Sequence, residues 1–262
     1  MLRSVEIELS VKFSPPFANT FSVICNDAKK PHKQMKSKKK ISKKFMNKKT
    51  IIGIILMFVG FLLIFTKFFG FGNFEIDKTL SLIISRTEFW ILTLLMFLFA
   101  KYYEKKDFLL ITEEKKKWWF YPLATFSVIA LVTIVMNIIV LIENNLGFHT
   151  NNKIETELAK IFCSNKILLV FTCITAGVTE ELLFRGFLLS RIKMLTKSNW
   201  IAVFLSALMF GLAHFGYDNF NRMFFPFIIG LIFGSFYVKY RSISVLIACH
   251  IIMDLYSLMS QC

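Results

Sequence analysis

From residue 50 onward, long apolar runs alternate with short polar segments. A membrane-spanning helix needs roughly 20 predominantly apolar residues, and most of these runs reach or approach that length. The pattern predicts seven spans, at Thr50–Phe69, Leu80–Ala100, Trp118–Ile142, Lys166–Ser190, Trp200–Phe215, Met223–Val238 and Ile243–Met259. Glycine and proline are sparse, which suits uninterrupted helices. We therefore expect an all-α fold, a polytopic transmembrane helical bundle.

The predicted spans differ in clarity. Trp118–Ile142 is the clearest, because Trp118, Trp119 and Tyr121 follow Lys115–Lys117 and form an aromatic belt beside a basic anchor. Arg86 and Glu88 interrupt the start of the second span. The fifth and sixth runs are shorter than a full crossing requires.

Composition and charge agree with a membrane protein. Hydrophobic residues make up 55% of the chain and 31 residues are Phe, more apolar surface than a soluble chain of this size can bury. The formal net charge of +15 could suggest nucleic acid, but the excess lies between the spans and no nucleic-acid motif accompanies it. We expect no nucleic-acid partner.

The basic loops predict an orientation and a domain division. Lysine and arginine gather in the N-terminal arm, in 101–117, in 190–199 and in 239–242, which the positive-inside rule places in the cytoplasm. The N-terminus of a multi-pass protein of the cell membrane is therefore expected inside the cell. We expect residues 1–49 to be a disordered arm on anionic lipids, 50–164 to be N-terminal transmembrane helices, and 165–262 to be a separate transmembrane core.

The cysteines show no motif. They have no CxxC pair and no regular spacing, at Cys25, Cys163, Cys173, Cys249 and Cys262. We expect incidental thiols, with neither a disulfide framework nor a zinc knuckle.

Ionisable residues in the last spans are the candidate chemistry, because a charge in hydrocarbon costs about 2.5–3.5 kcal/mol on insertion scales. Glu181 and Arg185 are four residues apart, which favours an ion pair on one helix face. Glu180 points about 100° away around the helix and is free to face another partner. Alone, this group also fits a helix end that pairs in solvent.

Two histidines lie on other apolar runs. Gly211 and Ala213 are small and allow the helix that carries His214 to approach a neighbour closely. His250 and Asp254 share a helix face, so Asp254 can orient the imidazole or join it at a metal. Each group alone also fits a satisfied core histidine or a helix–helix hydrogen bond. If the bundle buries all of these polar side chains in one cavity, they can satisfy one another's hydrogen-bonding and charge requirements.

These residues resemble a known family. Glu180-Glu181-x-x-x-Arg185, Phe210-x-x-x-His214 and His250-x-x-x-Asp254 look like the three motifs of the CPBP intramembrane peptidases. That group includes type II CAAX prenyl endopeptidases and the bacteriocin-processing or immunity proteins formerly called Abi proteins. The resemblance covers about residues 166–259 and implies hydrolysis of a peptide bond within the membrane. It makes 165–262 the expected catalytic transmembrane core.

The resemblance also implies roles. Glu180 and His214 would activate a water, His250 and Asp254 would stabilise the oxyanion or complete the polar site, and Arg185 would hold Glu181. Two chemistries stay open: a metallopeptidase with Zn²⁺ on Glu180, His214 and His250, and a metal-free glutamate-dependent hydrolase. Asp254 stands where members often have Asn, and an ionised Asp is a poorer oxyanion donor but a better ligand or histidine orienter.

Three functions remain open at this point. The first is an endopeptidase that acts on a peptide or membrane-associated protein, in bacteriocin processing, self-immunity or CAAX-type processing. The second is a non-catalytic membrane immunity protein of the same fold. The third is a proton- or ion-relay component of a transporter, because intramembrane Glu, His and Asp also mark ion paths.

Overall fold

The structure is a computed structural model that describes residues 47–64, 77–145, 153–214 and 220–262. Most of the predicted basic arm, the end of the first predicted span and Phe215 lie outside these residues. By its internal contacts the chain divides into two units, Met1–Lys48 and Lys49–Cys262.

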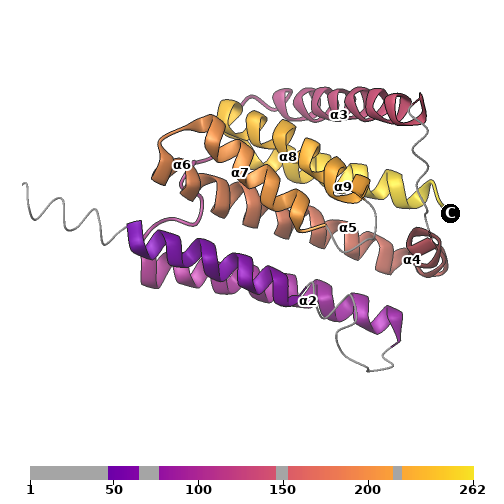
Figure 1. The fold of residues 1–262 in the computed structure, drawn as a ribbon, viewed down its shortest axis with the longest axis horizontal. Helices are drawn as coiled ribbons and strands as arrows, with labels where there is room; N and C mark the ends of the chain where they lie inside the picture. Colours follow the sequence, from indigo (N-terminus) through magenta and orange to yellow (C-terminus); the bar gives the residue numbers. More distant parts are fainter. Residues whose placement is uncertain (1–46, 65–76, 146–152, 215–219) are drawn as a thin grey trace, which may run out of the picture. The chain divides into compact units, whose positions relative to one another are not determined.

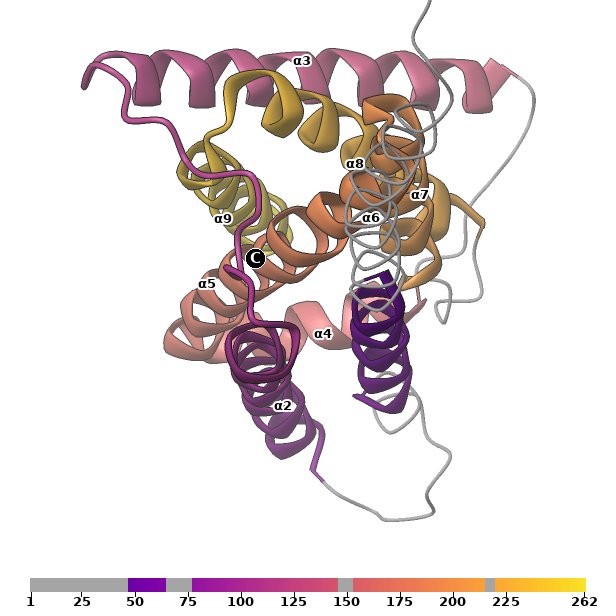
Figure 2. The ribbon, with the colours of Figure 1, turned by 90° about the vertical axis from the view of Figure 1, so that its left-hand side faces the viewer.

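Helices make up the described part of the chain, which contains no strand (Figures 1 and 2). After an apolar helix over Asn47–Ile64, the elements are α2 (Lys78–Leu98), the π-helix η1 (Phe99–Glu104), α3 (Phe120–Asn145), α4 (Lys153–Ser164), α5 (Lys166–Glu181), the π-helix η2 (Leu182–Leu189), α6 (Ser190–Thr196), α7 (Asn199–Leu212), α8 (Phe220–Tyr240) and α9 (Ile243–Met259). This confirms the all-α helical bundle.

The number of full crossings differs from the prediction. Among the described residues, five helices are long and apolar enough to cross a membrane, whereas α7 and α9 have 14 and 17 residues. Helix α7 packs on the longer α8, and α9 packs on α5, which continues through η2 and α6 as one helix of 31 residues over Lys166–Thr196. Protein therefore covers part of their surface. The predicted sixth span is longer than expected, because α8 extends to 21 residues.

The bundle has one central helix and several lipid-facing ones. In the helix over Lys166–Thr196, 67% of an apolar stretch of 18 residues is buried inside the protein, compared with 11% of the corresponding stretch in α3. The exposed large hydrophobic side chains of α2 and α3 are Ile, Leu, Val, Phe and Trp, which suits contact with lipid. The motif residues of α5 and η2 therefore occupy the interior of the bundle.

A buried ion pair joins the first spans to this centre. Arg191 of α6 lies 2.7 Å from Glu104 of η1, and both side chains are almost fully buried. Arg191 also donates to the carbonyl oxygen of Phe108, and Thr50 donates to Glu104. Arg191 was counted among the cytoplasmic loop charges, but the structure assigns it to this internal contact.

Helix α4 was not predicted, since the segment 143–166 had been read as a connection. In Figure 1 α4 is seen nearly end-on, whereas α2 and α5 run along the horizontal axis of the view. Its buried residues include Phe162, which packs with Leu82, Leu168 and Leu169. A short amphipathic helix that crosses the bundle direction is typical of the membrane interface.

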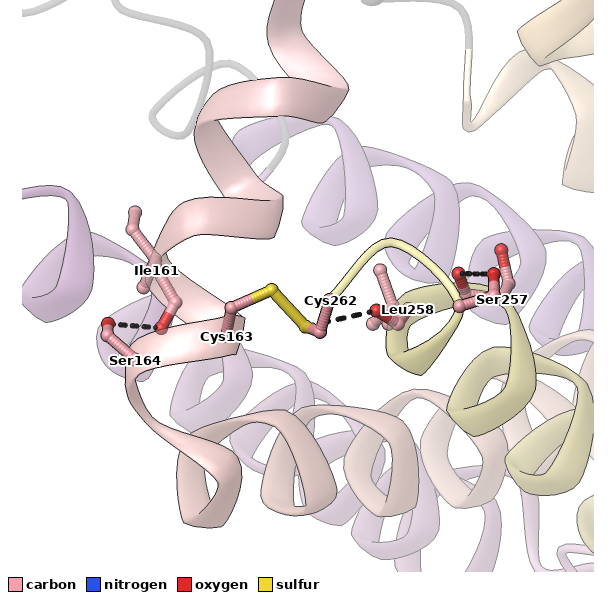
Figure 3. The surroundings of a disulfide bond; sticks show 7 residues. Ile161, Cys163, Ser164, Ser257, Leu258 and Cys262 are labelled. Carbon is pink, nitrogen blue, oxygen red and sulfur yellow. Dashed lines mark hydrogen bonds between the residues drawn. A yellow bond between two sulfur atoms is a disulfide. The ribbon is translucent and has the colours of Figure 1, made fainter.

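The prediction that no cysteines pair is wrong for two of them. Cys163 at the end of α4 and Cys262 after α9 form a disulfide, with their Cα atoms 5.3 Å apart (Figure 3). The two residues are 99 positions apart in sequence, so no local spacing reveals the pair. The bond ties the segment just before α5 to the segment just after α9, the two helices that carry most of the candidate site.

Replacing Cys163 or Cys262 by Ser should lower the melting temperature measured in detergent micelles. A disulfide typically contributes about 2–4 kcal/mol, chiefly by restricting the unfolded chain. As a control, a thiol reductant should bring the wild type down to the variants' value and leave the variants unchanged. Equal melting temperatures in all forms would contradict a stabilising role.

Candidate active site

The two adjacent glutamates lie at the end of α5, where it touches α9. Gly177 makes this approach possible: a Cβ at this position would lie 2.5 Å from the Ile251 side chain and 3.1 Å from the Ile251 backbone nitrogen. Glu180 and Glu181, one turn later on α5, are both buried. Close contact between the helices thus places these carboxylates beside His250 of α9.

Arg185 and Glu181 form a buried ion pair. Arg185 Nη1 lies 2.7 Å from Glu181 Oε1, and their side chains are 1% and 0% exposed. Arg185 belongs to η2, and its guanidinium lies over the rings of Phe210 and Phe233, 4.3 and 5.3 Å from their centroids. Such contacts stabilise a cation away from water. π-Helical segments are frequent at functional sites.

His250 connects this pair to the other acids. Its Nδ1 donates to Glu181 Oε1 at 2.8 Å. Its Nε2 then faces Glu180 Oε2 at 3.9 Å and Asp254 Oδ2 at 3.5 Å. The four-residue spacing predicts Asp254 as the orienting acid, whereas Glu181 makes the shorter contact. A ring nitrogen held by a carboxylate fixes the tautomer and aims the opposite nitrogen, here toward Glu180.

Asp254 is the more open member of the group. Its side chain is 36% exposed, compared with 12% for His250. It lies within electrostatic range of Glu180, His214 and His250. The site is therefore deeply buried at Glu181 and Arg185 and accessible at Asp254.

His214 follows α7 and reaches the same region. Its Nδ1 contacts the carbonyl oxygen of Phe210 at 2.8 Å. A carbonyl only accepts, so Nδ1 carries the proton and Nε2 is free to accept one. The Phe210 ring lies between the two histidines, with centroid distances of 4.9 Å to His214 and 6.3 Å to His250. Among the described residues, no hydrogen bond joins His214 to the other five predicted site residues.

The expected close approach at Gly211 is present. A Cβ there would lie 2.8 Å from the Met223 carbonyl oxygen and 2.8 Å from Phe227 Cβ, both on α8. The contact positions the end of α7, and His214 with it, against α8.

Two buried polar atoms of the site have unused hydrogen-bonding capacity. Glu181 Oε2 and Arg185 Nη2 are buried without a hydrogen-bond partner in the described part of the chain. Such atoms are uncommon, because each costs about 1–3 kcal/mol, more when charged. Polar capacity thus remains in the site that the described side chains do not use.

Sequence reasoning missed three contributors. Phe233 packs against both Arg185 and His250, but one Phe among 31 carries no signal. Gly177 is one of seven glycines in the predicted spans, and its position alone does not single it out. The bond from Glu181 to His250 depends on the α5–α9 contact, which the sequence does not show.

The carboxylates and histidines do not form a metal-ligand cluster. Within residues 47–64, 77–145, 153–214 and 220–262, no group of three or more His, Cys, Asp or Glu side chains could hold a metal ion. A catalytic zinc ion usually takes three protein ligands. The proposed set of Glu180, His214 and His250 does not provide such a cluster in this arrangement.

Comparison with known protein families gives a match over the residues that carry the candidate site. Residues 163–256 match the family model of the type II CAAX prenyl endopeptidase Rce1-like proteins. No curated protein and no solved structure matches the chain. The matched segment contains all six predicted site residues and supports an intramembrane endopeptidase as the general class. The match of residues 163–256 to the type II CAAX prenyl endopeptidase Rce1-like family model is thus consistent with a CPBP family intramembrane peptidase.

Proposed function

We propose that this chain hydrolyses a peptide bond within the membrane by means of a water that Glu180 activates. The observation that carries the proposal is the ordered series from Arg185 through Glu181 to His250, whose Nε2 faces Glu180 and Asp254 inside an apolar bundle. Intramembrane ionisable groups arranged in this way are retained for chemistry rather than for stability.

In the proposed reaction, Glu180 accepts a proton from the water while the water oxygen bonds to the carbonyl carbon of the substrate. His214 supports this step, because its unprotonated Nε2 accepts a hydrogen bond from the water. The intermediate then collapses, the C–N bond breaks, and Glu180 returns the proton to the departing amine. General acid–base catalysis of this kind contributes about 10²–10⁴-fold to the rate.

His250 is proposed to stabilise the oxyanion. Its Nδ1–H donates to Glu181, and when the imidazole is charged its second proton, on Nε2, points toward Glu180 and Asp254, where the carbonyl oxygen would lie. Asp254 is an acceptor when ionised and does not donate to an oxyanion. We assign it the role of keeping the imidazole protonated and in place.

No step is assigned to a metal, because the donors do not form a three-ligand group. Zn²⁺ on Glu180, His214 and His250 was one of the two chemistries left open by the resemblance. When bound, such an ion would polarise the carbonyl and lower the pKa of a bound water.

The proposed substrate is a peptide or membrane-associated protein that enters from the bilayer. The description of the matching family names a prenyl endopeptidase, which suggests a lipid-modified chain end; processing of a bacteriocin or its leader is the bacterial counterpart. In both uses the substrate brings an apolar segment to a site that lies between apolar helices.

The central test is cleavage of a peptide library by the purified chain in micelles. The wild type should cleave, and His214→Ala should lose at least about tenfold in rate because its acceptor nitrogen is removed. A chelator should leave the wild-type rate unchanged. Loss of activity with the chelator and its return with Zn²⁺ would instead favour the metallopeptidase. Equal cleavage by wild type and His214→Ala would contradict the assignment of His214.

We also propose an orientation in which the disulfide lies outside the cytoplasm. Disulfides persist in oxidising compartments. The bond joins α4 to the C-terminus, and both lie at the end of the bundle opposite α6 (Figure 1). The basic segments 101–117 and 239–242 then face the cytoplasm, as does the start of the Asn47–Ile64 helix. In intact cells, a membrane-impermeant maleimide should label Cys262 after brief reduction. Labelling only in lysed cells would reverse the orientation.

A further inference from the structure

Arg86 is a half-buried positive charge within α2, and among the described residues it lacks the carboxylate partner that the buried Arg185 and Arg191 have. Arg185 lies 2.7 Å from Glu181, and Arg191 lies 2.7 Å from Glu104. For Arg86, no carboxylate of the described residues lies within 4 Å, and its Nε is buried without a hydrogen-bond partner. Its guanidinium carbon lies 5.2 Å from the centroid of the Phe89 ring. A cation in an apolar helix calls for an anionic partner.

The neighbouring helix offers a second unpaired group. Thr172 of α5 is buried and its Oγ1 has no hydrogen-bond partner in the described residues. One turn further along both helices, Trp90 Nε1 donates to Thr175 Oγ1 at 3.1 Å. Because residues three or four apart share a helix face, this bond indicates that Arg86 and Thr172 also point into the seam between α2 and α5.

Other contacts show that α2 and α5 run in the same direction. Leu82, one turn before Arg86, packs in a cluster with Leu168 and Leu169, which precede Thr172. Arg86 is also within electrostatic range of Cys173. The order of these pairs along the two helices places Arg86 at the level of Thr172 and Cys173.

Arg86 also lies near the candidate site. It is within electrostatic range of Asp254, whose side chain is 36% exposed. Arg86 is eight residues into α2, about 12 Å along the helix axis from Lys78. This depth favours a group drawn into the site over a phospholipid phosphate at the helix end.

We propose that Arg86 and Thr172 bind an anionic oxygen group, a carboxylate or a phosphate, of the molecule that occupies the site. A guanidinium can take both oxygens of a carboxylate, and the threonine hydroxyl can donate to one of them. The source that the depth favours is a carboxylate of a bound peptide, which rests on the proposed function. A phospholipid phosphate has the same chemistry and is distinguished by the test.

The test measures binding rather than cleavage. The Kd of each probe is measured by fluorescence anisotropy in phosphate-free maltoside micelles. The first probe is a labelled apolar hexapeptide with a free C-terminal carboxylate, and the second is the same peptide as its C-terminal amide. The third is a labelled short-chain phosphatidylglycerol. The measurements use the wild type and the Glu180→Gln background, where hydrolysis cannot interfere. The wild type should bind the carboxylate peptide about tenfold more tightly than the amide.

Arg86→Gln should abolish this preference, and Thr172→Val should reduce it with little change in side-chain volume. Lys166→Gln removes a charge from the exposed start of α5 and should leave the preference intact. If Arg86→Gln weakens only the lipid probe, the anion is a lipid phosphate. If Arg86→Gln leaves the affinities for all three probes unchanged, the anion site is disproved. Since Arg86→Gln could impair folding, Arg86→Lys and the melting temperature of each variant serve as checks.

Affinity and cleavage separate the two proposals. A carboxylate preference that depends on Arg86, in a chain that cleaves no peptide, would retain the anion site and reject the peptidase. Cleavage without such a preference, together with unchanged lipid binding, would reject the anion site alone.

Discussion

Replacing Glu180 by Gln should lower the rate of peptide cleavage by about 10²–10⁴-fold, because the amide cannot accept the proton of the attacking water. The side chains have nearly the same volume, and Glu180 makes no buried ion pair as short as that of Glu181. The melting temperature should therefore change little. The measurement is the initial rate of cleavage by purified protein at matched concentrations.

The matched control is Glu114→Gln. Glu114 lies in the polar segment before α3, with a side chain that is 43% exposed, and pairs with Lys116 and Arg241. Its hydrogen bond from Lys116 lowers the pKa of the carboxyl, so it is ionised near neutral pH like a typical surface glutamate. The control thus makes the same acid-to-amide change away from the site and should retain the full rate. Full activity in Glu180→Gln would remove Glu180 from the mechanism.

Replacing Arg185 by Met should cause the largest loss of stability of any single change in the site. Arg185 compensates the charge of Glu181, and both side chains are almost completely buried. Breaking a buried pair by removing one partner costs about 3–5 kcal/mol, because the remaining charge has no compensation. The melting temperature in micelles should fall accordingly, and cleavage should fall with it, since Glu181 orients His250.

A double variant separates the structural role from the catalytic one. Glu181→Gln combined with Arg185→Met leaves no uncompensated charge, so much of the lost stability should return. The amide oxygen can still accept from His250 Nδ1, but the carboxylate that favours a protonated imidazole is gone, so cleavage should stay below the wild-type rate. Arg241→Met, which breaks an exposed pair with Glu114, should lower the melting temperature far less. Equal stability of Arg185→Met and wild type would contradict the compensation argument.

Much of the fold could be predicted because a bilayer simplifies the problem. A backbone in hydrocarbon must satisfy its own hydrogen bonds, so long apolar runs predict helices directly. The runs that became α2, α3, α5 and α8 were identified in this way. Helix α4 was missed because its apolar residues form only one stripe among polar ones, and this pattern carries no span signal.

The candidate residues could also be predicted, for a related reason. Charged side chains in apolar helices are costly, so Glu180, Glu181, Arg185, His214, His250 and Asp254 stand out from their surroundings. The pair of Glu181 with Arg185 follows from a spacing of four along one helix. Arg86 stood out as well, but the sequence presented it only as an interruption of a span.

What the sequence alone determined, then, is the class of fold and the identity of the polar residues, because both depend on local patterns of hydrophobicity and helical spacing. The tertiary structure decided which residues are partners. Glu181, rather than Asp254, holds His250 because Gly177 lets α5 and α9 come into contact. Cys163 and Cys262 are 99 residues apart in the sequence, and they meet because the packing of the helices brings α4 to the end of the chain. Such long-range contacts cannot be seen in the local pattern of either segment.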